Sequence, residues 1–320
     1  MKLLKIILAF SLPLFLILGC KKSGDSSTSS TTSTSSTTST TSTASCTADT
    51  TSTTLTASSS CLDGFYTHPK AADFTDFKIS SPLPTCFTDE YARRKDMGDQ
   101  YLQILGSVSI VGESSEQICD MTRVGHALLG FVDSDADGKV DDENLWNTYA
   151  PSLNSKDNRL VLYVAKEKQN YKKFDSDSPS VYSQAFSTAS NGEVLKFRTV
   201  LEELFHFLQN VLWRVYYKTN FGFEENPASI VDAAAAKALQ DKHYVYDPDC
   251  TSEKSCLVTE FFFCVMTDLM TGWPDSTVPA NTEWTLKGQT TTIQTEYKDM
   301  VEMVTTRQNN GTMPKKWPGG

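Results

Sequence analysis

The clearest pattern in the chain is a stripe of apolar residues between positions 194 and 215, spaced at alternating steps of three and four. This spacing puts one continuous apolar face along a helix, so we predict a helix over about residues 192–217 that packs on a core. Ser190 and Glu193 have the spacing of a capping box at its start. The stripe consists of Val194, Phe197, Leu201, Leu204, Leu208, Val211 and Val215.

Three other segments have recognisable patterns. Residues 101–111 and 159–165 have the β-branched and aromatic content of strands, and residues 292–306 have the pattern of a polar helix. A β-containing first half followed by a mostly helical second half predicts an α+β domain. In such a domain a small sheet packs on the helix over residues 192–217.

The N-terminus has the composition of a signal peptide. Lys2 and Lys5 precede an apolar run that is too short for a membrane span, and a small residue comes before Cys20. Residues 1–19 are therefore predicted to be removed. The segment resembles a bacterial lipobox, which implies that Cys20 carries lipid, including palmitate. The expected location is the bacterial cell envelope, at the outer membrane or cell surface, with the lipid anchor as the contact with the membrane.

Serine and threonine dominate the chain from Cys20 to residue 60. Such a segment offers little apolar surface to offset the entropy of ordering, so we expect residues 20–60 to form a disordered tether. Residues 61–320 are then expected to fold as one domain.

The net charge of the chain narrows the class of partner. The formal charge of -10 becomes -12 when residues 1–19, with two lysines and no acids, are removed. This acidity argues against a nucleic-acid partner.

An exported chain can form disulfides, and we predict a bond between Cys250 and Cys256 in a polar loop. Cys264 lies in an apolar run and is expected to be a buried free thiol.

Residues 133–144 match most of an EF-hand-type calcium loop. Carboxylates at alternate positions, a turn-forming Gly138 and a backbone carbonyl are what a hard, flexible cation site requires. The twelfth position lacks the usual bidentate Glu, which should weaken binding. The predicted ligands for Ca²⁺ are Asp133, Asp135, Asp137, the carbonyl of Lys139, Asp141 and Asn144. A bound ion would connect two packed elements, and an acidic surface turn is the alternative.

The face of the predicted helix opposite its apolar stripe carries Glu202, His206 and Trp213. Residues 201–209 read LEELFHFLQ, one substitution from the zinc-peptidase motif H-E-x-x-H. Glu202 and His206 keep the spacing of the two metal-binding histidines, and Glu203 keeps the position of the general base. A solvated helix face would show the same pattern.

A metal site needs a third protein ligand, and two glutamates are candidates. Glu225 lies before a predicted helix, and Glu260 opens an apolar aromatic segment, TEFFFCV. The second pattern resembles the E-Y-F-A segment of zincin-like metallopeptidases, in the group that includes anthrax lethal factor. The resemblance covers residues 199–273 and implies a zincin-like fold with Glu260 as third ligand. Glu225 remains the alternative, because some peptidases take this ligand from the following helix.

Glu202 in place of the first histidine changes the expected chemistry. Zinc sites usually contain at most one carboxylate, so the set could hold Zn²⁺, Mn²⁺ or Fe²⁺, or no metal. If the site works, the reaction is hydrolysis of a peptide or protein substrate with Glu203 as general base. The competing hypothesis is a non-enzymatic, calcium-stabilised binding lipoprotein. A di-iron carboxylate site is excluded because no second Glu-x-x-His pair occurs, and no G-x-S-x-G turn supports serine chemistry.

Overall fold

The computed structural model describes residues 53–81, 101–104, 108–112, 115–153, 159–167, 181–189, 196–223, 228–245, 254–273 and 283–320. Several predictions concern residues outside these ranges: the signal peptide over residues 1–19, the lipid-bearing Cys20, the tether up to residue 52, the capping box of Ser190 and Glu193, Glu225 and Cys250. The described part of the chain combines helices with a sheet, which agrees with the predicted α+β class.

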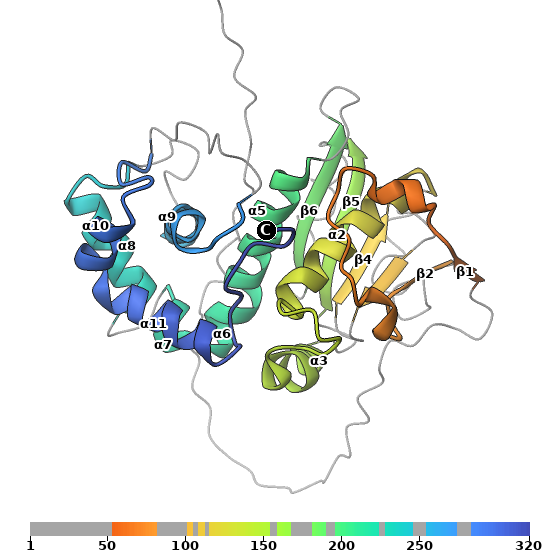
Figure 1. The fold of residues 1–320 in the computed structure, drawn as a ribbon, viewed down its shortest axis with the longest axis horizontal. Helices are drawn as coiled ribbons and strands as arrows, with labels where there is room; N and C mark the ends of the chain where they lie inside the picture. The colour runs from red at the N-terminus through yellow and green to blue at the C-terminus, as the bar shows by residue number, and fades with distance from the viewer. Residues whose placement is uncertain are drawn as a thin grey trace, which may run out of the picture.

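One six-stranded sheet, in sequence order, lies on one side of the described fold (Figure 1). The first four strands pair antiparallel, whereas β4, β5 and β6 pair parallel. The strands are β1 (Thr53–Leu55), β2 (Lys78–Ser81), β3 (Tyr101–Ile104), β4 (Val108–Gly112), β5 (Arg159–Glu167) and β6 (Val181–Ala189). β1 belongs to this sheet, although its residues lie inside the segment expected to be a disordered tether.

The strand predicted over residues 101–111 is a hairpin of two strands. Tyr101 of β3 pairs with Val111 of β4, so the chain reverses between them. The sequence between the two strands contains Gly106 and Ser107, a turn signal that the prediction of a single strand did not take into account. The strand predicted at residues 159–165 is confirmed as β5.

Helix α2 (Ile118–Val132) connects the parallel strands β4 and β5, which require a crossover of this kind. Nearly every residue from Met121 onward is buried, because α2 packs on the sheet and on α5. Gly130 permits close contact: a Cβ there would lie 2.7 Å from both Pro318 and Tyr66. The sequence analysis did not predict α2, whose residues from Val124 onward are all buried.

The helix predicted over residues 192–217 begins later, at Phe197. Lys196 is its N-cap and makes no capping hydrogen bond through its side chain. The helical segment comprises α5 (Phe197–Phe207), a π-helical stretch η5 (Leu208–Trp213) and α6 (Arg214–Tyr216). α5 lies between the sheet and the other helices (Figure 1) and packs against α2, α9 and β6.

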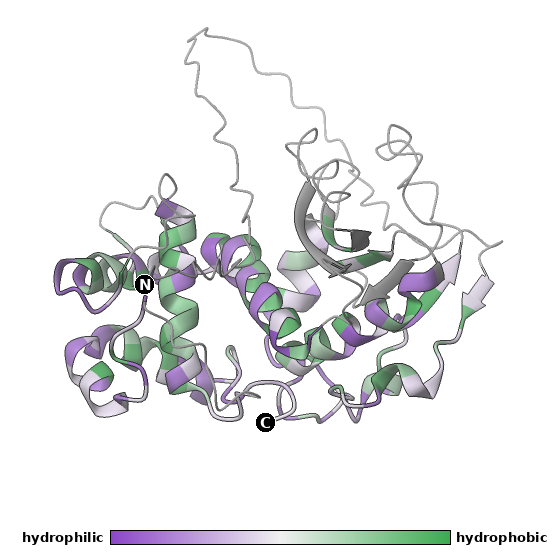
Figure 2. Ribbon diagram, turned by 90° about the horizontal axis from the view of Figure 1, so that it is seen from above, coloured by the Kyte–Doolittle hydropathy of each residue, from purple (hydrophilic) through white to green (hydrophobic). Residues whose placement is uncertain are grey.

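The helical second half packs around α9 (Lys254–Leu269), whose central residues are buried. Its other helices are α7 (Lys218–Phe221), α8 (Ile230–Gln240), α10 (Thr290–Glu296) and α11 (Lys298–Asn309). The helix predicted over residues 292–306 is therefore two helices that meet at Tyr297. Figure 2 shows hydrophobic residues concentrated where helices meet and hydrophilic residues on their outer sides. The segment after α11 returns to the core, where Trp317 is fully buried.

Candidate metal centre

His206 lies at the centre of a polar cluster between α5 and α9. Its Nε2 is 3.7 Å from Glu260 Oε2, and its Nδ1 is 3.9 Å from Glu203 Oε2. The side chain is buried, the Phe263 ring packs edge-on against it, and Nε2 has no hydrogen-bond partner. Burial lowers the pKa of His206 to about 4, so the imidazole is neutral near pH 7. A neutral, buried ring nitrogen without a hydrogen-bond partner can offer its lone pair to a metal ion.

Glu260 reaches this cluster from α9. The helix begins at Lys254, so Glu260 lies inside it. The sequence analysis had instead placed Glu260 at the start of this segment. Only 9% of the residue is exposed. Stabilisation of a helix N-terminus therefore does not explain this carboxylate, because the helix dipole acts mainly in the first turn. Glu260 instead lies opposite His206.

Glu202 completes the cluster one helical turn before His206. One ligand atom from each of Glu202, His206 and Glu260 lies within 4.8 Å of the others. Bonds of about 2.1 Å to one ion would bring such atoms to roughly 3.4 Å apart, so small side-chain rotations would close the site. Burial raises the pKa of Glu202, and the charge of Arg198 partly opposes this. These acidic and imidazole groups could hold a metal ion, as the sequence predicted.

Glu203, the predicted general base, lies beside the cluster on the Nδ1 side of His206. Carboxylates next to the free ring nitrogen of a metal-binding histidine commonly fix its tautomer. The position of Glu203 is thus compatible with orienting His206 as well as with accepting a proton. The other proposed third ligand, Glu225, lies outside the described residues.

The π-helical stretch η5 changes which residues face the core after His206. The wider turn shifts the following residues by about one position around the axis. Trp213, predicted to lie on the ligand face, is therefore buried, whereas Val215 of the predicted stripe is 38% exposed. The shift also buries Gln209 against α9, where its Oε1 has no hydrogen-bond partner. An α-helical pattern could not reveal this change of register.

The acidic loop after α2 forms a second cluster. Asp133, Asp135 and Asp141 offer carboxylate oxygens that lie within 4.8 Å of one another, and these groups could hold a cation. Asp133 organises the loop, because its carboxylate accepts hydrogen bonds from the backbone N–H groups of Asp137 and Gly138 at 3.0 and 2.9 Å. Gly138 has φ +88°, a conformation that favours glycine. Burial raises the pKa of Asp133 and of Asp141.

Of the other predicted carboxylate ligands, Asp137 is not in this group of three. The Asp137 carboxylate accepts a hydrogen bond from the Lys139 N–H at 2.8 Å, and Asn144 is exposed at the start of a helical turn. That turn, η4 (Leu145–Tyr149), is capped by Asp142, whose Oδ1 accepts from the Leu145 N–H at 3.0 Å. The Tyr217 hydroxyl also donates to Asp142. Asp142 therefore connects the loop to the rest of the fold.

His68 is a buried neighbour of the acidic loop that sequence reasoning missed. Its Nδ1 accepts from the Lys70 N–H, so Nε2–H donates to the Asp133 carbonyl, 3.0 Å away. Its backbone N–H donates to His126 Nδ1 at 3.0 Å. A lone histidine 65 positions from its partner has no local sequence signature.

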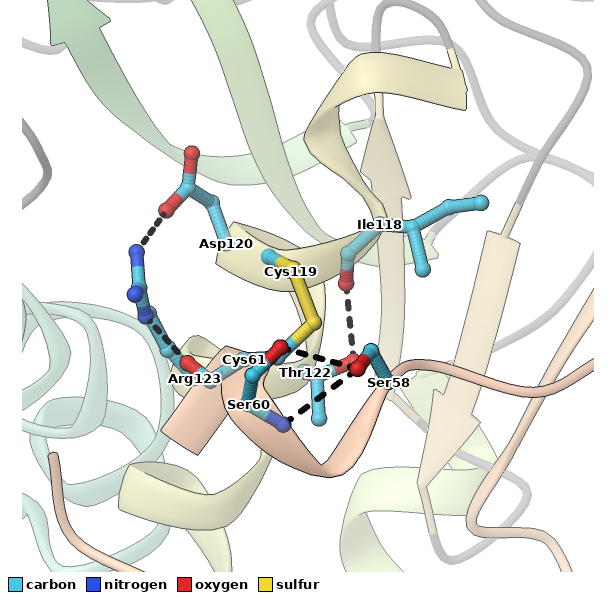
Figure 3. Close-up of a disulfide and its surroundings, with 8 residues drawn as sticks. All are labelled: Ser58, Ser60, Cys61, Ile118, Cys119, Asp120, Thr122 and Arg123. Atoms are coloured by element: carbon cyan, nitrogen blue, oxygen red, sulfur yellow. Dashed lines mark hydrogen bonds and ion pairs between the residues drawn. A yellow bond between two sulfur atoms is a disulfide. The ribbon is translucent and has the colours of Figure 1, made fainter. Parts of the chain in front are cut away.

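The observed disulfide joins Cys61 to Cys119 at the start of α2 (Figure 3). The sequence did not predict this pairing, because the two cysteines are 58 positions apart. Cys256 of the predicted pair is disulfide-bonded, but Cys250 lies outside the described residues. Cys264 is buried and is not disulfide-bonded, as predicted.

Within the described residues, no helix combines the length and apolar character needed to cross a membrane. A comparison of the chain with protein-family models, curated proteins and solved structures finds no match.

Proposed function

We propose that this chain is a lipid-anchored protein of the bacterial cell envelope whose zincin-like domain is a metal-dependent hydrolase of peptides or proteins. The observation that carries the proposal is the convergence of Glu202, His206 and Glu260 on one buried point, where His206 Nε2 has no partner. Two carboxylates and an imidazole fit a divalent cation, which would neutralise charges that are costly to bury together. The lipid on Cys20 and the signal peptide over residues 1–19 give the proposed location.

The donor set favours Mn²⁺ or Fe²⁺ alongside Zn²⁺. Carboxylate oxygens suit the harder ions, whereas zinc sites usually contain imidazole or thiolate with at most one carboxylate. When bound, such an ion supplies a Lewis acid that polarises a carbonyl and activates water. Two anionic ligands weaken that effect, which makes this site a weaker activator than one with two histidines.

The residues of the chain have distinct roles in the proposed hydrolysis. His206 binds the ion through Nε2, and Glu202 and Glu260 bind it through carboxylate oxygens. Glu203 would accept a proton from the attacking water after its carboxylate turns from His206 Nδ1, now 3.9 Å away, towards the side of the ring that carries Nε2. The same contact favours the tautomer in which Nδ1 carries the proton and Nε2 is free for the ion.

We propose Ca²⁺ as the cation of the acidic loop, with a structural role. Asp133, Asp135 and Asp141 supply oxygen donors, and Asp133 already organises the loop through two backbone hydrogen bonds. An ion there would stabilise the connection between α2 and η4. A calcium-stabilised lipoprotein that binds peptides without cutting them is the second candidate function, favoured by the carboxylate of Glu202 at a position where the peptidase motif has histidine.

The test is the metal content of the purified full-length protein, measured by inductively coupled plasma mass spectrometry. Wild type is compared with His206→Ala and with His243→Ala, a matched control because His243 contacts Tyr297, away from the cluster. Stoichiometric manganese, iron or zinc that is lost only in His206→Ala supports the hydrolase. A peptide-library assay with Glu203→Gln then tests cleavage. Calcium alone, unchanged in His206→Ala, would contradict the hydrolase and support the binding protein.

A further inference from the structure

The segment from Cys61 to Asp73 lies between the two cation clusters and contacts elements of both. At one end, the disulfide joins Cys61 to Cys119, and Arg123 Nε donates to the Cys61 carbonyl at 2.7 Å (Figure 3). The guanidinium of Arg123 also lies 5.2 Å from the ring centre of Phe65. The beginning of the segment is thus held on α2 by the disulfide and by the side chain of Arg123.

The middle of the segment packs on the first residue of the metal-binding helix. Phe197 begins α5, about one and a half turns before Glu202. The Phe65 ring packs edge-on against Phe197 at 4.9 Å between ring centres, and Tyr66 stacks on Phe197 at 6.3 Å. These two rings therefore brace the N-terminal end of α5, the end that carries Glu202.

The far end of the segment is anchored at the acidic loop. The backbone N–H of His68 donates to His126, and its ring donates to the Asp133 carbonyl. Between the two anchors, Asp63, Gly64 and Thr67 are exposed and Phe65 and Tyr66 are only partly buried. The disulfide adds a covalent restraint at the start of this partly exposed stretch.

We propose that the Cys61–Cys119 disulfide makes the metal cluster on α5 competent to bind its ion, so that the site is completed only in an oxidising compartment. This proposal rests on the proposed function. In the reaction the two thiols form the S–S bond and lose two electrons and two protons, which pass to an oxidising disulfide that becomes two thiols. Before export, the reduced chain lacks the covalent restraint on the segment that carries Phe65 and Tyr66, and α5 frays from its N-terminal end towards Glu202. The hydrolase is thereby silent in the cytoplasm.

The first test compares Mn²⁺ binding, by isothermal titration calorimetry, in the full-length protein and in a Cys61→Ser, Cys119→Ser double variant. Cys264→Ser is the matched control, because Cys264 is a buried thiol outside any disulfide. We expect the control to bind like wild type and the double variant, folded by circular dichroism, to bind at least tenfold more weakly. Equal affinity in a folded double variant would overturn the proposal.

A second variant keeps the proposal testable if the double serine variant does not fold. Phe65→Ala with Tyr66→Ala retains the disulfide and removes the two rings that contact Phe197. It should also bind Mn²⁺ at least tenfold more weakly, and unchanged affinity would contradict the brace.

Hydrogen exchange separates this proposal from the proposed function. Without metal, the amides of residues 200–207 should exchange at least tenfold faster in the aromatic double variant and in any folded double serine variant than in wild type. If wild type binds no metal, the hydrolase fails, while faster exchange still supports the brace. Unchanged exchange would refute the brace whether or not metal binds.

Discussion

Glu260 Oε2 lies 3.7 Å from His206 Nε2, across the interface between α9 and α5. The two residues are 54 positions apart in the sequence, and both are buried or nearly so. A carboxylate in the interior of an apolar helix is costly unless it has a partner of opposite charge. The pair is therefore explained best as part of a cation site, and removal of the charge of Glu260 tests this directly.

Glu260→Gln should lower metal affinity while retaining the shape of the side chain. Glu260 is one of two carboxylates in the proposed set of three ligands. Its replacement should weaken metal binding by roughly 100-fold or more, because an amide oxygen is a much poorer metal ligand than a carboxylate. Titration calorimetry with Mn²⁺ measures the change, and Glu296→Gln, at a surface ion pair with Lys237, is the control. Wild-type affinity in Glu260→Gln would show that Glu260 is not a ligand.

Glu202→His restores the intact H-E-x-x-H motif and should shift the metal preference toward Zn²⁺. Replacing one of two carboxylates with imidazole gives a donor set typical of catalytic zinc sites. We expect the ratio of zinc to manganese affinity to rise at least tenfold, measured by competition between the two ions. A histidine placed at the neighbouring Phe207 would be a poor control, because Phe207 is fully buried. The control is therefore His206→Ala in the Glu202→His background. An unchanged ratio would indicate that Glu202 does not contact the ion.

Local patterns predicted the parts of this fold that are encoded by neighbouring residues. The i, i+4 spacing of Glu202 and His206 requires only a helix, and alternating aspartates before Gly138 require only a turn. Groups that could hold a cation accordingly come together in both segments, and Glu260 lies close to His206.

Features that depend on tertiary contacts could not be predicted in this way. The Cys61–Cys119 pairing depends on where α2 begins relative to a distant segment. The π-helical stretch after Phe207 buries Trp213 and exposes Val215, because packing on α9 outweighs the regular α-helical period. His68 is similarly placed by the chain around it, without a local signal.

Gly130→Ala should destabilise the protein although alanine is the better helix former. Helix propensity alone would stabilise α2 by about 1 kcal/mol. However, the new Cβ would lie 2.7 Å from both Pro318 and Tyr66, whose rings cannot move aside easily. We expect a net loss of roughly 1–3 kcal/mol in the free energy of unfolding, measured with urea. A gain in stability would show that residue 318 and Tyr66 do not pack on α2 in solution.

The stability of the protein should fall in mild acid, with His126 as one identifiable cause. Burial, followed by the charge of His68, lowers the pKa of His126 to about 4, whereas an unfolded histidine has a pKa of about 6.5. Between these values the unfolded chain binds a proton that the folded chain does not, so stability is present above pH 6.5 and is lost as the pH falls towards 4. The loss from this residue is about 3 kcal/mol.

His126→Asn isolates this contribution to the pH dependence. The asparagine oxygen can accept the hydrogen bond that His126 Nδ1 accepts from the His68 backbone, but the side chain does not titrate. The variant should be less stable at pH 7, because it packs less volume, yet lose about 3 kcal/mol less than wild type between pH 6.5 and 4. Buried carboxyls such as Asp120, whose pKa is raised by burial, act with the opposite sign in both proteins and cancel in the comparison. Urea unfolding at several pH values supplies the measurement, and parallel curves for the two proteins would mean that His126 is accessible to protons in the folded state.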